Sequence, residues 1–400
     1  MPVSKLRTRL YALAFVDEFG PLYALFTLWF NDNGVSTGQI STAFVLWAAV
    51  AIVLEVPSGV LADRVDRRRL LAFAFGLRAG GIVVWLLSPN FAGLLIGAMT
   101  WAVHSALASG AWEAHIHDQL TAADHAALYG TVKARVGQFS NLGIAASALL
   151  AFGLVELGVS IAALGWLTVA IHFVSMALVL TMPDVRWVAL EAQSQEPAYR
   201  AWLVGLRAGF QEVLSSAVVL RIVLLGALVE GLFVVDEYVP LLARDRGVAD
   251  ATVSLFVLAV WSGLLVGDEL AARWPSLGGR PLGLAVVVGS AAMLAAILSN
   301  AAAALILIGV GYAALEALWT LGDARLQERV GSGNRATVSS VRGVLTGLVG
   351  AVAFSGIGLL SNGDDPSPGL ILVASLLMLV GLLTVVWLPS ALAEQKNTAQ

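Results

Sequence analysis

The chain has 400 residues, of which 58% are hydrophobic and only 12% are charged. An average soluble domain carries about 25% charged residues, so this composition excludes a water-soluble globular protein and a disordered chain. The net charge of -4 excludes the basic field of a nucleic-acid binder, and the absence of cysteine excludes disulfides and thiolate metal sites.

Apolar runs long enough to cross a membrane recur along the whole chain. A spanning helix needs about 20 apolar residues, and in lipid only helices and closed barrels pair every backbone group. The runs are continuous and do not alternate every second residue, which favours helices over barrel strands. In chain order the sequence predicts twelve spans, at residues 7–30, 38–62, 70–88, 91–113, 131–155, 159–182, 218–243, 250–272, 281–299, 301–323, 336–361 and 369–389.

The distribution of Lys and Arg predicts the orientation of these spans. Most of the 23 basic residues fall in the N-terminal segment, the C-terminal tail and alternate loops, whereas the loops of the other side hold only Arg244 and Arg246. Because basic loops stay in the cytoplasm, we expect both termini on the cytoplasmic side. The short loops and the composition rich in Ala, Leu, Val and Gly favour the plasma (inner) membrane of a bacterium.

An internal repeat divides the chain into two halves. At a shift of 213 residues, the segment 32–35 matches 245–248, and Asp17 matches Glu230. The acidic matches carry weight because carboxylates inside a membrane are rare. Two halves that rock about a site at their interface are typical of transporters, and a duplication without transport is the alternative. The predicted domains are an N-terminal six-helix bundle (1–182), a cytoplasmic linker (183–217) and a C-terminal six-helix bundle (218–400).

A charged loop between the second and third spans carries a family resemblance. Residues 59–69 read Gly-Val-Leu-Ala-Asp-Arg-Val-Asp-Arg-Arg-Arg, which resembles the G-x-L-A-D-R-x-G-R-[RK] signature of the major facilitator superfamily. Asp66 stands where that family usually has glycine. The resemblance implies an all-α membrane protein with twelve transmembrane helices in two pseudo-symmetric six-helix bundles. It is similar to poorly characterised, drug-efflux-like members of the family.

The same loop contains a candidate conformational latch. A carboxylate such as Asp63 at a helix end needs a cation or a helix N-terminus, and the resemblance implies a contact with the eleventh span, which begins near Arg335. We expect Arg67 to pair with Asp118 beyond the fourth span. The alternative is that the arginines only set the topology. The latch candidates are Gly59, Asp63, Arg64, Arg67 and Asp118.

Ionisable side chains inside the spans are the candidate proton-coupling and substrate-binding residues. Each costs about 2.5–3.5 kcal/mol at the membrane centre, and an apolar pocket raises the pKa of a carboxyl group toward neutral pH. Asp17 and Glu230 are the first choice because they occupy the same place in each half. The full set is Asp17, Glu18, Glu230, Glu113, Glu316, Asp236 and Glu237.

Other polar and aromatic residues complete the candidate site. Glu113 has a structural alternative, an ion pair with the charge partners Arg135 and Arg342. His104 and His172 lie within spans, where they either relay protons or make hydrogen-bonded packing contacts. An apolar, aromatic cavity with few carboxylates favours a lipophilic or cationic solute. The candidates for lining it are Tyr23, Trp101, Tyr238, Tyr312 and Trp319.

These features predict a proton-coupled secondary active transporter that works by alternating access and exports lipophilic or cationic small molecules as a drug–proton antiporter. The alternatives are proton-coupled uptake of a nutrient or metabolite, and a non-transporting membrane sensor or enzyme. We expect no enzyme, because the chain shows no P-loop, H-E-x-x-H or G-x-S-x-G motif. The expected partners are a small-molecule solute and membrane lipids, without nucleic acid. We expect a monomer with a proton as coupling ion, without cofactor or metal.

Overall fold

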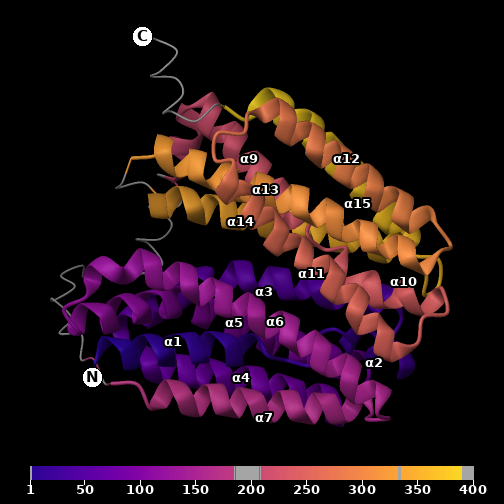
Figure 1. The fold of residues 1–400 in the computed structure, drawn as a ribbon, viewed down its shortest axis with the longest axis horizontal. Helices are drawn as coiled ribbons and strands as arrows, with labels where there is room; N and C mark the ends of the chain where they lie inside the picture. The colour runs from indigo at the N-terminus through magenta and orange to yellow at the C-terminus, as the bar shows by residue number, and fades with distance from the viewer. Residues whose placement is uncertain (1, 184, 186–206, 208, 332–334, 390–400) are drawn as a thin grey trace. The chain divides into compact units, whose positions relative to one another are not determined.

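The computed structural model describes residues 2–183, 185, 207, 209–331 and 335–389, but not the side chains of 55–57, 59–60, 62–64, 110 and 335–336. The described chain is almost entirely helical (Figure 1). It divides into two compact units. The first unit holds Met1–Val35 and Ala49–Arg200, and the second holds Ser36–Ala48 and Ala201–Gln400. The expected linker, 183–217, lies mostly outside the described residues.

The helices of the first unit bury apolar faces against one another. α4 packs against α5 and α7, and α1 packs against α6 and α7. Side chains such as Leu10, Leu71 and Val132 form a common apolar core between them. The helices are α1 (Val3–Glu18), α2 (Phe26–Asp32), α3 (Thr37–Arg64, whose first turns group with the second unit), α4 (Arg67–Leu87), α5 (Phe91–Ala122), α6 (Tyr129–Glu156) and α7 (Ile161–Leu180).

Polar side chains begin three of these helices. Asp66 accepts hydrogen bonds from the backbone N–H groups of Arg68 and Arg69 at the start of α4. Asn90 and Ser160 cap α5 and α7 in the same way. Such caps satisfy donors that the first turn of a helix leaves free. Asp66, which departs from the glycine of the family signature, therefore serves as the N-cap of α4.

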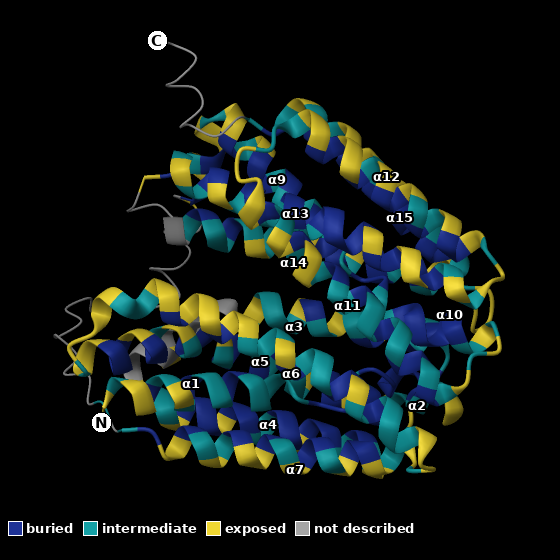
Figure 2. Cartoon of the chain, in the orientation of Figure 1, coloured by how far each residue is buried: buried dark blue, intermediate teal, exposed yellow. Residues whose placement is uncertain are grey.

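The second unit is organised around α13. This helix is largely buried (Figure 2) and packs against α9, α11 and α12, while α12 also packs against α15 and α14 packs against α9. The small residues of α13 allow this close approach of neighbouring backbones. The helices are α9 (Ala217–Gly231), α10 (Val239–Asp245), α11 (Asp250–Arg273), α12 (Gly279–Leu298), α13 (Ile306–Arg329), α14 (Arg335–Leu360) and α15 (Ser367–Trp387).

The first span of each unit is broken along its length. α1 ends at Glu18 and α2 begins at Phe26, whereas α9 ends at Gly231 and α10 begins at Val239. These end points differ by the same 213 residues that relate the two halves of the sequence. Pro21 contributes to the first break because proline has no N–H to donate within a helix. The single helices expected over the first and seventh spans are therefore wrong.

The short helices after the two breaks end in the same backbone turn. Gly34 has a φ of 80° and Gly247 a φ of 75°, a region that favours glycine. In both turns the glycine N–H bonds to the carbonyl three residues earlier, and the following valine N–H bonds to the carbonyl five residues earlier. This pair of hydrogen bonds is the Schellman motif. The repeat is therefore present in the backbone geometry as well as in the sequence.

The number of spans depends on how the first break is treated. In the described part of the chain, eleven segments are long and apolar enough to cross a membrane. The twelfth expected span consists of α1 and α2, of which α1 has 16 residues. A helix of that length extends about 24 Å, less than the hydrocarbon core of about 30 Å. The fourth span, expected to end at 113, continues as α5 to Ala122.

Candidate functional site

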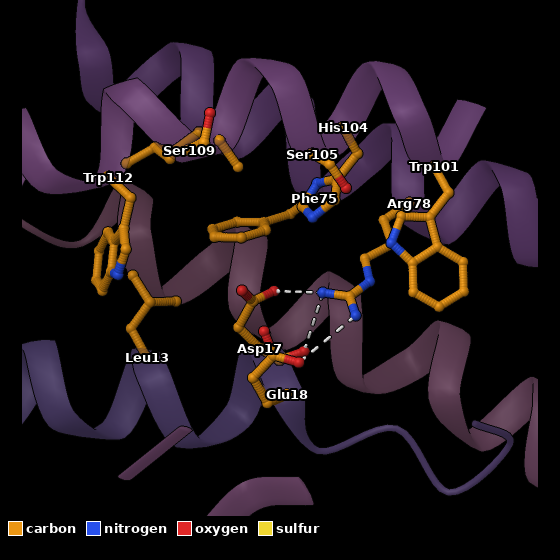
Figure 3. A pocket seen from close by; sticks show the side chains of 12 residues that line it. Leu13, Asp17, Glu18, Phe75, Arg78, Trp101, His104, Ser105, Ser109 and Trp112 are labelled. Atoms are coloured by element: carbon orange, nitrogen blue, oxygen red, sulfur yellow. Dashed lines mark hydrogen bonds and ion pairs between the residues drawn. The ribbon is translucent and has the colours of Figure 1, made fainter. Parts of the chain in front are cut away.

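A cavity of about 370 Å³ opens among α1, α4 and α5 of the first unit (Figure 3). Its walls are mostly apolar and aromatic, and its charged residues come from the end of α1 and the middle of α4. The size lies within the usual range for small-molecule pockets, about 300–1,000 Å³. The lining residues are Leu13, Asp17, Glu18, Leu71, Phe75, Arg78, Trp101, His104, Ser105, Ala108, Ser109 and Trp112.

Arg78 joins the two carboxylates of this cavity. Its Nη1 lies 3.3 Å from Asp17 Oδ1 and its Nη2 lies 3.7 Å from Glu18 Oε2. The same guanidinium also donates to the backbone carbonyl of Asp17 at 3.4 Å. The side chain of Arg78 is only 5% exposed, so these contacts compensate for the loss of its hydration (Figure 3). One guanidinium facing two carboxylates leaves one negative charge in excess when both acids are ionised.

Aromatic rings fix the position of the guanidinium. The Arg78 Cζ lies 4.9 Å from the centre of the Tyr23 ring and 5.0 Å from that of Trp101. Tyr23 belongs to the break between α1 and α2, and its hydroxyl lies 2.5 Å from His172 Nε2 on α7. One turn earlier on α7, Thr168 Oγ1 accepts the backbone N–H of Leu22 at 3.1 Å. α7 therefore holds the broken segment through two side chains, and the broken segment holds the arginine.

The other polar side chains of the cavity belong to one histidine and two serines. His104 is 4% exposed, and its Nδ1 lies 2.9 Å from the backbone carbonyl of Ala74. Ser109 donates to the carbonyl of Ala106 at 3.3 Å. Ser105 also lines the cavity. Phe75, next to His104, and Trp112 offer apolar ring surface to the same cavity (Figure 3).

The second unit holds Asp236 without a cation among its described partners. Asp236 lies in the 3-10 turn between α9 and α10. Its carboxylate accepts hydrogen bonds from the Tyr312 hydroxyl at 2.8 Å and from Trp261 Nε1 at 3.1 Å. The Tyr312 hydroxyl in turn accepts the backbone N–H of Asp236 at 3.0 Å. Glu237 is the next residue and is half-buried.

The remaining acidic candidates of this unit are Glu230, which has neutral partners, and Glu316, which lies beside another acid. Glu230, at the end of α9, is exposed and accepts from Trp319 Nε1 at 3.4 Å and from the Thr346 hydroxyl at 3.3 Å. Glu316 lies beside Asp268, which accepts from the Thr320 hydroxyl at 3.0 Å. Asp17 and Glu230 thus occupy equivalent positions with different surroundings. Asp17 faces an arginine, and Glu230 faces an indole and a hydroxyl.

Two charge pairs differ from the sequence prediction. Glu113 is exposed and pairs with Lys133 at 2.7 Å, not with Arg135 or Arg342. Arg135 instead donates to the side chain of Gln138 at 2.9 Å. Arg342 pairs with Asp323 at 2.5 Å and lies over the Trp319 ring. The expected pairing is wrong because each ion pair forms within its own unit: Glu113 and Lys133 correspond to Asp323 and Arg342 at shifts of 210 and 209 residues, and both pairs are present.

The predicted ion pair between Arg67 and Asp118 is present at the cytoplasmic end expected for α4 and α5. Gly59, Asp63 and Arg64 are latch candidates whose side chains lie outside the described part of the structure. The role of the latch therefore stays a prediction.

Arg68, the residue next to Arg67, contacts the chain at the end of α7. Arg68 donates to the backbone carbonyl of Met182 at 3.1 Å, and Gln119 donates to that of Pro183 at 2.8 Å. Arg9, from α1, donates to the carbonyl of Thr181 at 2.5 Å. The last carbonyls of a helix lack partners within it, and cationic side chains stabilise them. Side chains from α1, α4 and α5 therefore fix the end of α7, where the linker begins.

The aromatic candidates have separate places. Tyr23 and Trp101 contact Arg78 in the first unit. Tyr312 and Trp319 hold acidic side chains in the second unit, and Tyr238 is buried with its hydroxyl 2.7 Å from that of Ser41 in the same unit. Arg78 was not identified from the sequence as the partner of Asp17. The signal was available, because an arginine inside a membrane requires an acidic partner.

The chain matches the family model described as Major Facilitator Superfamily over residues 10–354. Among curated protein sequences, no match to the chain was found. In the part of the chain that the structure describes, no group of three or more His, Cys, Asp or Glu side chains is arranged to hold a metal ion.

Solved transporter structures share the fold over nearly the full chain. The nucleoside transporter NupG is 13% identical with a TM-score of 0.72, covering 96% of this chain and 98% of that chain. The inward-open xylose transporter XylE from E. coli is 14% identical with a TM-score of 0.69, covering 97% and 96%. A D-xylose-proton symporter is 14% identical with a TM-score of 0.70, covering 96% and 97%. With the family model matched over most of its length and the same helical architecture throughout, this chain belongs to the major facilitator superfamily.

Proposed function

We propose that this transporter couples solute movement to protons and exports lipophilic organic cations by alternating access. Its membership of the superfamily makes it a multi-pass membrane protein and a secondary transporter of small molecules, not an enzyme, and such transporters need no cofactor. The observation that carries the finer proposal is the cluster of Asp17, Glu18 and Arg78 beside an aromatic cavity.

The charge balance of this cluster supports exchange between a proton and a cation. Arg78 neutralises one of the two carboxylates, so one negative charge is left in an apolar setting. An uncompensated charge is costly there, and either a bound proton or a cationic solute removes it. Both together would leave the site positively charged, so the two compete. Competition for one site is the requirement for antiport.

The walls of the cavity support a lipophilic solute. Phe75, Trp112 and Leu13 line it with apolar surface, and a cation gains attraction from the face of an aromatic ring. Arg78 already covers the ring of Trp101, so Trp112 and Phe75 are the rings that remain for a solute. A strongly hydrated ion would lose its water without compensation against these walls.

Flux measurements in proteoliposomes test the proposal. We expect an imposed pH gradient to drive tetraphenylphosphonium, a lipophilic cation, against its own gradient, with protons moving in the opposite direction. Asp17→Asn removes the ionisable group but keeps its shape, so gradient-driven flux is expected to fall about tenfold or more. Any remaining flux should no longer respond to pH.

A matched control is available in Asp124→Asn. Asp124 is exposed in a loop with a φ of 60°, a conformation that asparagine adopts as readily as aspartate. This variant should transport like the unaltered protein. Wild-type flux of every cation tested that ignores the pH gradient would overturn proton coupling and leave only the family assignment.

Uptake with a proton is the second candidate, because His104, Ser105 and Ser109 give the same cavity a hydrogen-bonding side. One structural neighbour is a D-xylose-proton symporter. In that case the solute carries hydroxyl groups, and protons enter with it. The sign of the proton movement in the flux experiment separates the two candidates, since antiport and symport move protons in opposite directions relative to the solute.

The proposal also includes the membrane and the orientation. We infer a bacterial plasma membrane with both termini in the cytoplasm, from the basic residues of alternate loops, and a monomer as the working unit. The chain contains no cysteine, so one cysteine introduced into a loop reports the side of that loop by its reaction with a membrane-impermeant thiol reagent. Labelling of a Gly278→Cys variant from outside intact cells would contradict the orientation.

A further inference from the structure

A second cavity, of about 580 Å³, lies in the second unit, and no acidic residue is among those that line it. α13 forms its floor through small residues such as Gly309 and Ala313, and α11 and α12, which both pack against α13, form its walls. Two of the lining side chains, Val288 and Val310, are 64% and 51% exposed. The cavity is therefore a groove on the surface of this helix group.

The groove offers almost no hydrogen-bonding group to an occupant. Among its lining residues only Ser262 and Trp274 have polar side chains. The Ser262 hydroxyl already donates to the backbone carbonyl of Leu258 at 2.8 Å. A polar solute would lose its water here without compensation, whereas a hydrocarbon chain would gain contacts on three sides. The walls therefore suit an acyl chain.

One end of the groove carries basic side chains. Trp274, Leu277 and Pro281 line this end. Arg273 and Arg280 are exposed next to these lining residues, and the buried Arg325 donates to the backbone carbonyl of Leu277.

The acidic side chain one turn before Arg273 on α11 already forms an ion pair. The N-terminus of α12, which lies at this end of the groove, has no side-chain cap. Glu269 pairs with Arg273 at 2.6 Å, which leaves Arg280 as the exposed basic group beside the groove. α12 begins at Gly279 without a side-chain cap, so the backbone N–H groups of Gly279 and Arg280, which precede Pro281, have no partner within the helix. The end of the groove is complementary to a phosphate group.

We propose that this groove binds one anionic phospholipid, with an acyl chain along α13 and the phosphate beside Arg280 and the start of α12. The lining residues of α11 run from Ala259 to Leu270, which is about 16 Å of helix, and Trp274 follows just after the helix ends. One leaflet of the hydrocarbon core is about 15 Å thick, so the groove accommodates an acyl chain of that leaflet in full. Trp274, 52% exposed, lies where an aromatic side chain marks the lipid–water boundary.

The test compares two lipids with the same acyl chains on the purified full-length protein. Dioleoylphosphatidylglycerol is anionic and dioleoylphosphatidylcholine is not, and native mass spectrometry in detergent gives the affinity of the first bound lipid. We expect the anionic lipid to bind about fivefold more tightly, the contribution of one basic residue near the membrane surface.

Two variants separate the headgroup from the acyl chain. Arg280→Gln should remove the preference between the two lipids, whereas Arg135→Gln, an exposed arginine of the first unit, should keep it. Ala285→Phe fills the groove and should weaken both lipids alike. Leu284→Phe is the matched control on the same helix, because Leu284 is 59% exposed and does not line the groove. Equal binding of the two lipids to the unaltered protein, or unchanged binding to Ala285→Phe, would overturn the proposal.

Discussion

The broken spans of the two units share a backbone and differ in their chemistry. At the 213-residue shift Tyr23 corresponds to Asp236, and each lies in the break that follows the first helix of its unit. In the first unit the break presents a ring to Arg78, which holds Asp17. In the second unit the break itself supplies the carboxylate, and Tyr312 and Trp261 hold it with neutral donors.

The two units therefore share the position of the helix break, but the side chains in and around the break make different contacts. A guanidinium stabilises an ionised carboxylate and opposes its protonation. Hydroxyl and indole donors bring no charge, so they accommodate Asp236 without fixing a counter-charge in the unit. In the first unit one guanidinium faces two carboxylates, and in the second a carboxylate is held by hydrogen bonds to neutral groups. In the mechanism that we propose, only the first of these clusters exchanges its excess charge. The following variants test whether this distinction is functional.

The largest effect is expected for Arg78→Met, which leaves Asp17 and Glu18 without their cation. Removing one partner of a buried ion pair costs about 3–5 kcal/mol, so the free energy of unfolding should fall by an amount of that order. The melting temperature of the purified protein measures the loss. Transport should be lost, because Arg78 no longer orients the carboxylates of Asp17 and Glu18.

A triple variant shows whether charge is the cause. Arg78→Met combined with Asp17→Asn and Glu18→Gln removes all three charges, and the melting temperature should recover most of the loss while transport stays absent. If the triple variant remains as unstable as Arg78→Met alone, Arg78 stabilises the protein mainly by packing over Tyr23 and Trp101. In that case the difference in charge between the two units does not explain their stability.

A smaller effect is expected for Tyr312→Phe in the second unit. The substitution removes one donor to the Asp236 carboxylate and the acceptor of its backbone N–H. Leaving such groups without partners costs about 1–3 kcal/mol, which thermal unfolding detects. Because the bond carries no full charge on the tyrosine, this loss should be smaller than that of Arg78→Met. A loss as large as that of Arg78→Met would show that the hydrogen bonds to Asp236 stabilise the protein as much as the ion pairs of Arg78 do.

The smallest effect is expected for Lys133→Met. Lys133 and Glu113 are both about half exposed, and exposed ion pairs contribute less than about 1 kcal/mol. The melting temperature should barely change, and flux should stay close to that of the unaltered protein. A strong loss of transport would place Glu113 on the route of the solute or the proton, the role that the sequence alone also permits.

Much of the fold follows from the sequence because each apolar run has one stable form in lipid. Composition and run length predict the helices, and the acidic matches at a constant shift predict the repeat. The breaks are harder to predict, since an apolar run continues through Leu22 and Leu25 although the helix does not. Pro21 lies within the first break, and the glycines at 34 and 247 follow the short helices after the two breaks. These signals become specific only when both halves are compared.

The site was predicted less well than the fold because partners depend on which helix faces meet. Asp17 and Asp236 stand out from their positions in apolar runs. Their partners Arg78, Trp261 and Tyr312 lie on other helices, and no spacing in the sequence specifies that contact. Arg67 was predictable because it belongs to the family signature, and Asp118 because it follows the expected fourth span on the same side of the membrane. His172 stood out only as a histidine within a span, and Thr346 had no signal in the sequence.

The attachment of the first break to α7 has a consequence for genetics. Thr168 and His172 hold Leu22 and Tyr23, yet neither lines the cavity. A screen for loss of resistance or growth will recover substitutions at these two positions alongside those that contact the solute. Dose–response curves distinguish the two groups, because a distorted scaffold weakens the handling of every compound in parallel, whereas an altered wall changes their rank order.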